Sequence, residues 1–147
     1  MDSQFIILLV EDNPADVRLT EEALADGKVQ HELHVARDGV EALAFLRQES
    51  PFQKAPRPDI ILLDLNLPCK DGREVLAEIK ADPELVRIPV IILTSSEADE
   101  DIRHTYDLYA NGYIVKPVDL DQFFKMIKQL KRFWMSIVIL PQNESGR

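Results

Sequence analysis

The chain has 147 residues, enough for one domain of ordinary size and too few for two. Its composition, 46% hydrophobic and 29% charged with five glycines, excludes collagen, low-complexity disorder and a disulfide scaffold. The 26 acidic residues against 17 Lys and Arg give a formal net charge of -9, which argues against binding to nucleic acid or to anionic lipid.

Five short apolar runs, separated by longer stretches with helical spacing, predict five parallel strands packed between helices. The second run alternates apolar and polar residues, which is typical of an edge strand, whereas we expect the others to be buried on both faces. In chain order, the predicted strands are Phe5–Val10, Glu32–Ala36, Asp59–Leu63, Pro89–Leu93 and Tyr113–Val115.

Five helices are predicted after these strands, because each following stretch repeats apolar residues at helical spacing behind a start signal. The fourth helix should stop at Asn111-Gly112 through a left-handed residue. Strands and helices together predict an α/β fold, a doubly wound (βα)5 parallel sheet. The predicted helix starts are Pro14, the residues after Gly39 and Gly72, the region of Ser96, and Asp119 as the N-cap of a last helix that ends at Pro141.

Two segments exceed what a five-stranded sheet needs. Residues 48–58 contain three prolines and are predicted to form an ordered excursion that is longer than most connections of this kind. The last helix continues into a C-terminal extension, 133–147. Its apolar side chains cover more surface than one helix stripe packed on the sheet can bury. Either the extension folds back over its own domain, or it forms a symmetric homodimer with the fourth helix and fifth strand, the alternative that we favour. The predicted interface residues are Tyr106, Tyr109, Phe124, Phe133, Trp134 and Ile137.

Polar residues follow four of the predicted strands at the point where each strand ends. The carboxyl ends of parallel strands converge on one crevice, so we expect these side chains to meet there. Clustered carboxylates need a positive charge among them, and oxygen ligands of this kind suit Mg²⁺. The residues are Glu11 and Asp12 after the first strand, Asp64 after the third, Thr94 after the fourth and Lys116 after the fifth.

Asp64 is the central carboxylate and is predicted to be a nucleophile that forms an aspartyl phosphate. Transfer of a phosphoryl group requires neutralisation of its oxygens, for which Mg²⁺ and the Lys116 ammonium are the cations available. The hydroxyl of Thr94 can donate a hydrogen bond to an arriving phosphoryl oxygen. The sequence therefore predicts phosphoryl transfer at this end of the sheet.

At these positions the chain resembles the receiver domain of two-component response regulators, over roughly residues 5–135. The resemblance is carried by the four motifs Leu8–Asp12, Leu62–Pro68, Leu93–Ser95 and Val115–Pro117, which occur in order at strand ends. It implies a single receiver domain, 1–147, with flavodoxin-like topology and strand order 2-1-3-4-5.

The same resemblance implies roles for individual residues. Mg²⁺ would be held by Asp12, Asp64 and the main-chain carbonyl of Asn66, with Glu11 acting through water. Phosphorylation would turn Thr94 toward the phosphoryl group and rotate Tyr113 inward. The bond between Lys116 and Pro117 would be cis.

A narrower resemblance concerns the excursion, the helix Asp71–Lys80 and the terminal Phe133-Trp134 and Leu140-Pro141. These segments are similar to those of small stand-alone response regulators that pair with cyanobacterial phytochromes. The partner would then be a light-sensing histidine kinase, although a receiver that serves another histidine kinase stays open. We expect no effector domain after residue 141, so the signal would leave through a protein contact.

Individual residues also argue against other classes of function. An aspartate-nucleophile phosphohydrolase would carry a second Asp two residues after the nucleophile, where this chain has Asn66, so rapid turnover and an enzyme are not expected. A scaffold that is never phosphorylated is disfavoured because Asp64, Thr94 and Lys116 are all present. A single cysteine, Cys69, and the lack of a signal or membrane-spanning run predict a cytoplasmic protein.

Overall fold

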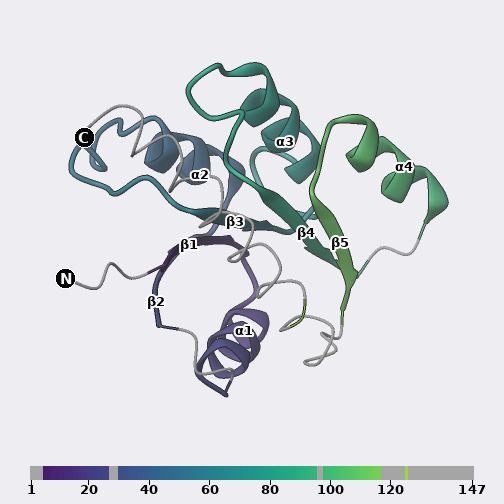
Figure 1. The fold of residues 1–147 in the computed structure, drawn as a ribbon, viewed down its shortest axis with the longest axis horizontal. Helices are drawn as coiled ribbons and strands as arrows, with labels where there is room; N and C mark the ends of the chain where they lie inside the picture. Colours follow the sequence, from purple (N-terminus) through teal and green to yellow (C-terminus); the bar gives the residue numbers. More distant parts are fainter. Residues whose placement is uncertain (1–4, 27–29, 96–97, 117–124, 126–147) are drawn as a thin grey trace, which may run out of the picture.

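The computed structural model describes residues 5–26, 30–95, 98–116 and 125, and in these ranges it forms a parallel five-stranded sheet between helices (Figure 1). The strand order is β2-β1-β3-β4-β5, which confirms the predicted fold class and topology. None of the described helices is both long and apolar enough to cross a bilayer. The strands are β1 Phe5–Val10, β2 His31–Ala36, β3 Ile60–Leu63, β4 Val90–Thr94 and β5 Gly112–Val115; the helices are α1 Pro14–Asp26, α2 Gly39–Leu46, α3 Gly72–Ala81 and α4 Asp99–Asp107.

The sheet divides the core into two apolar layers, because successive side chains of a strand point to opposite faces. On one face Ile7 and Leu9 of β1 pack with Leu24 of α1. On the other face Leu8 and Val10 pack with buried residues of α2 and α3. Figure 1 shows α1 on one side of the sheet and α2 and α3 on the other. The solid apolar runs of the central strands are therefore explained by burial on both faces.

The two end strands differ from the central strands in burial. β2 is an edge strand with mostly half-buried residues, as predicted. β5 is the other edge, and its residues alternate between buried and half-buried. The prediction that β5 is buried on both faces is therefore wrong, since the last strand of the described sheet has a neighbour on only one side. The predicted last helix from Asp119 and the extension 133–147 lie outside the described residues.

The excursion at 48–58 is ordered, as predicted. The ring of Phe52 lies 5.5 Å from the ring of Phe45 in α2, and Phe52 packs against the core. The side-chain amide of Gln48 donates to the carbonyl of Ala55 at 2.8 Å, which closes the excursion on itself. The segment is thus a packed part of the domain and not a linker.

The left-handed residue after α4 is Tyr109, with φ 68°, so the predicted stop at Asn111-Gly112 is wrong. The amide of Ala110 donates to the carbonyl of Thr105 and the amide of Tyr109 to that of Tyr106, both at 2.9 Å, which is a Schellman motif. Asn111 already pairs with β4, because its amide donates to the carbonyl of Val90 at 2.7 Å. The helix must therefore end before Asn111, and Gly112 is the first residue of β5.

Replacing Tyr109 with glycine should stabilise the fold. A left-handed conformation costs an L-residue about 1–2 kcal/mol, and the greater freedom of glycine in the unfolded chain offsets part of this gain. The Tyr109 side chain is 76% exposed, so little packing is lost. We expect a gain of about 0.5–1 kcal/mol in the free energy of unfolding by urea denaturation at low protein concentration.

The matched control is Tyr106→Gly in the last turn of α4, which should lose up to about 1 kcal/mol because glycine weakens a helix. A Tyr109→Gly variant that is less stable than the wild-type chain would show that the tyrosine ring makes a contact worth more than the strain.

Candidate functional site

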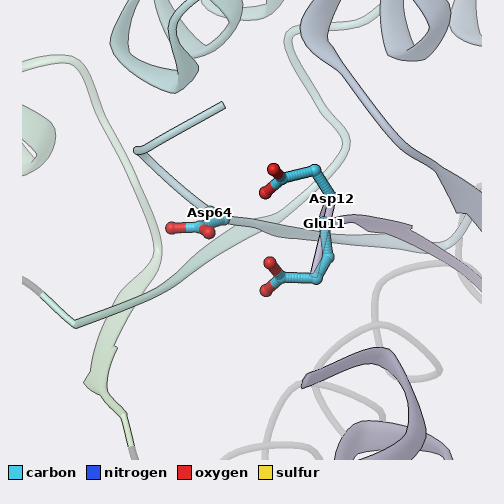
Figure 2. A group of neighbouring side chains, drawn as sticks. All are labelled: Glu11, Asp12 and Asp64. Carbon is cyan, nitrogen blue, oxygen red and sulfur yellow. The ribbon is translucent and has the colours of Figure 1, made fainter. Parts of the chain in front are cut away.

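Three carboxylates lie together at the carboxyl ends of β1 and β3. Val10 pairs with Leu63 in the sheet, so the residues that follow them, Glu11 and Asp64, leave their strands side by side. Figure 2 shows Glu11 and Asp12 extending toward the side on which Asp64 lies. One carboxylate oxygen from each of the three residues lies within 4.8 Å of the other two. The predicted convergence of these acids is confirmed.

β4 and β5 bring the predicted hydroxyl and ammonium to the same place. Thr94 pairs with Val115, and the amide of Lys116 donates to the carbonyl of Thr94 at 2.8 Å. The Lys116 side chain reaches the carboxylates, where Nζ donates to Glu11 Oε1 at 2.6 Å and to Asp64 Oδ2 at 3.3 Å. Strand pairing alone therefore assembles the acidic cluster and its cation.

The structure adds one carboxylate that the sequence analysis missed. Asp16, in the first turn of α1, accepts a hydrogen bond from Lys116 Nζ at 2.8 Å. The predicted site residues directly follow strands, whereas Asp16 belongs to the helix that follows β1. Its signal was present, because a carboxylate in the first turn of that helix must lie near the same end of the sheet.

Burial changes the acid-base properties of the cluster. Glu11 is only 2% exposed, and its pKa is raised to about 7, first by loss of solvent and also by the charge of Asp64, against the lowering effect of Lys116. Burial favours the neutral form of Lys116, but hydrogen bonds to Asp16 and Glu11 outweigh this and raise its pKa. Lys116 is therefore a permanent cation.

The donor set fits a hard divalent cation. The Lys116 ammonium contacts the carboxylates of Glu11, Asp16 and Asp64, and Asp12 lies beside two of them, so carboxylates outnumber the described ammonium. All donors are oxygens, the ligand type that Mg²⁺ and Mn²⁺ prefer. A cation held by Glu11, Asp12 and Asp64 would relieve the repulsion between them.

The hydroxyl of Thr94 is buried and makes no hydrogen bond within the described residues. Buried polar groups without a partner are rare and costly, and at a site they indicate a missing ligand. The hydroxyl belongs to the strand end next to Lys116 and therefore suits an anion bound between Lys116 and Asp64. This position agrees with the predicted role of Thr94.

The segment after Asp64 folds tightly against the start of α3. Asp71 caps α3 in a capping box with Glu74, and the amide of Gly72 donates to the carbonyl of Leu65 at 2.9 Å. A Cβ at Gly72 would lie 2.2 Å from the carbonyl oxygen of Asp64. Only glycine allows α3 to approach the backbone of Asp64 so closely.

The structure places some of the remaining predicted residues. Asn66 is exposed, and its backbone amide donates to Asp64 Oδ1 at 3.2 Å. Tyr113 is half-buried and packs against the core. Tyr106 and Tyr109 are exposed, 47% and 76%. Phe124, Phe133, Trp134 and Ile137, together with the peptide bond between Lys116 and Pro117, lie outside the described residues.

The fold and this site define a class of signalling domain. The family model of the response regulator receiver domain matches residues 7–128, so the chain belongs to the response regulator receiver family. It is accordingly a phosphoacceptor of two-component signalling.

Among its relatives, the response regulator Rcp1 of Synechocystis sp. is 51% identical over 136 residues, 92% of either chain. The solved structure of the phosphorylated cyanobacterial phytochrome response regulator RcpA is 56% identical, with a TM-score of 0.79 over 92% of this chain and 96% of that one. The Mn²⁺-bound form of Rcp1 is 51% identical, with a TM-score of 0.76 over 88% and 93%.

Proposed function

We propose that Asp64 accepts a phosphoryl group from a phosphohistidine of a partner histidine kinase. A carboxylate oxygen of Asp64 forms the new O–P bond while the N–P bond of the phosphohistidine breaks and the imidazole leaves. The observation that carries this proposal is the buried hydroxyl of Thr94, which has no hydrogen-bond partner among the residues that the structure describes. It lies at the strand end next to Lys116, whose ammonium contacts Asp64.

Each surrounding residue has a part in this reaction. Asp12, Asp64 and the main-chain carbonyl of Asn66 would hold Mg²⁺ directly and Glu11 would hold it through water. The bound ion would supply positive charge to the phosphoryl oxygens. Lys116 contributes a second, permanent positive charge, and Thr94 donates its hydroxyl to a phosphoryl oxygen. The related response regulator Rcp1 has a Mn²⁺-bound form, which supports a divalent cation at this site.

The aspartyl phosphate shifts the domain between two conformations. Thr94 turns toward the phosphoryl group, and Tyr113, now half-buried at the end of the sheet, moves inward. The added charge can bias this equilibrium only because it contacts Thr94 and Lys116 differently in the two states. The chain is then a switch and not an enzyme with turnover.

The partner is a histidine kinase of the phytochrome type, and both proteins act in the cytoplasm. The description of RcpA as a cyanobacterial phytochrome response regulator supports this pairing, because RcpA matches 92% of this chain at 56% sequence identity. A kinase of another type remains the second candidate, since the phosphoryl chemistry of the site is the same for both.

Mass spectrometry of the intact chain tests the function. After incubation with acetyl phosphate and Mg²⁺ we expect one added phosphoryl group, and with the metal chelated we expect none. Asn66 lacks the carboxylic acid that would drive rapid hydrolysis, so turnover should be slow. Rapid multiple turnover of phosphate esters would instead favour the phosphohydrolase, and an unmodified chain with saturating donor and Mg²⁺ would contradict the proposal.

The domain forms a homodimer through α4, β5, the predicted last helix and the C-terminal extension. Tyr106 and Tyr109 at the end of α4 expose large aromatic surfaces, which are typical anchors of such contacts. Trp134→Ala should therefore shift the light-scattering mass from dimer toward monomer. The matched control is Leu19→Ala on α1, which also exposes an apolar side chain, 52%. Equal masses of wild type and Trp134→Ala would remove this interface.

A further inference from the structure

Lys116 contacts the same carboxylates that a divalent cation needs. Its ammonium lies 2.6 Å from Glu11 Oε1 and 3.3 Å from Asp64 Oδ2, and both residues belong to the three-carboxylate cluster. Two cations on shared oxygen ligands repel each other, because a desolvated site screens their charges poorly. Entry of Mg²⁺ therefore requires the ammonium to give up contact with Glu11 and Asp64.

Asp16 is the third acceptor of this ammonium, and it is not part of the metal cluster. Its Oδ2 accepts from Lys116 Nζ at 2.8 Å, a shorter contact than that with Asp64. Asp16 belongs to the first turn of α1, whereas the three clustered carboxylates follow β1 and β3. This carboxylate can hold the ammonium whether or not a metal is bound.

We propose that Asp16 is a positioning residue that draws the Lys116 ammonium away from the metal ligands while Mg²⁺ is bound and Asp64 carries no phosphoryl group. This inference rests on the proposed function of the site. The Lys116 ammonium then lies beside Asp16 of α1, and it contacts a phosphoryl oxygen once Asp64 is phosphorylated. Without the Asp16 carboxylate, Glu11 and Asp64 are the remaining contacts of the ammonium given by the structure, and the ammonium competes with Mg²⁺ for them.

Titration calorimetry with MgCl₂ alone at fixed ionic strength tests this role without phosphorylation. Asp16→Asn should weaken Mg²⁺ binding about tenfold, the loss typical when a residue that orients a metal site is removed. Asp16→Ser should do the same, whereas Asp16→Glu, which keeps the carboxylate, should restore most of the affinity. Glu21→Gln, exposed further along α1, makes the same change in net charge and should leave the affinity unchanged.

A double-mutant cycle separates positioning from simple loss of charge. In a Lys116→Met background the competing ammonium is gone, so Asp16→Asn should change Mg²⁺ affinity less than about threefold. An equal loss in both backgrounds, or wild-type affinity in folded Asp16→Asn and Asp16→Ser, would overturn the inference. Failure of the wild-type chain to bind Mg²⁺ or to be phosphorylated would overturn the proposed function instead, so the two failures are distinguishable.

Discussion

The Asp64→Asn variant should gain no phosphoryl group under conditions in which the wild-type chain gains one. The amide of Asn carries no negative charge and its nitrogen lone pair is delocalised, so the O–P bond of an acyl phosphate cannot form. The exchange conserves volume, and the Asn oxygen can still accept the hydrogen bond that the amide of Asn66 donates to Asp64 Oδ1. We therefore expect a folded variant without phosphorylation, measured by intact-protein mass spectrometry with acetyl phosphate and Mg²⁺.

Asp59→Asn is the matched control, because Asp59 precedes the amino end of the same strand that Asp64 follows. Its Oδ2 accepts from the amide of Ile6 at 2.8 Å, a bond that Asn can keep. Burial raises the pKa of Asp59, so removing its charge should not weaken the fold. This variant should be phosphorylated like the wild-type chain. A phosphoryl group found on Asp64→Asn would instead identify another acceptor.

Gly72→Ala should destabilise the domain by about 2–3 kcal/mol, although alanine is the better helix former. The added Cβ would lie 2.2 Å from the carbonyl oxygen of Asp64 and 2.6 Å from the Cα of Leu65. These are backbone atoms, so either α3 or the Asp64 segment must move. Urea unfolding measures the loss, and phosphorylation at limiting Mg²⁺ should fall as well.

Helix propensity alone predicts the opposite sign, a gain of about 0.5–1 kcal/mol for Gly72→Ala. Ala81→Gly, exposed at the other end of α3, calibrates this term and should lose about that amount. A Gly72→Ala variant as stable as the wild-type chain would mean that α3 can shift without cost, which would contradict the close packing against Asp64.

The main residues of the site could be predicted because their positions follow from the strands. A buried parallel strand is a solid apolar run, its end is visible in the sequence, and all such ends meet at one edge of the sheet. Asp64 and Lys116 come directly after their strands, so no knowledge of side-chain packing is needed to bring them together. The same reasoning yields the order of helices and strands.

Features that depend on three-dimensional packing were less accessible. The position of Asp16 beside Lys116 depends on the rotation of α1 about its axis, which apolar spacing defines only coarsely. The left-handed residue after α4 is Tyr109 because Asn111 is already bound to β4, a tertiary constraint that overrides the preference for glycine. The half-burial of β5 follows from its place in the strand order and not from its composition.

The bond between Lys116 and Asp16 joins residues 100 positions apart in the chain. On the ribosome, where synthesis runs from the amino terminus, α1 and the acidic strand ends emerge long before the lysine does. Until then the nascent domain carries its cluster of acids without this counter-ion. Completion of the pocket is thus a late event in folding, and a prematurely terminated chain cannot present a working phosphoacceptor to a kinase.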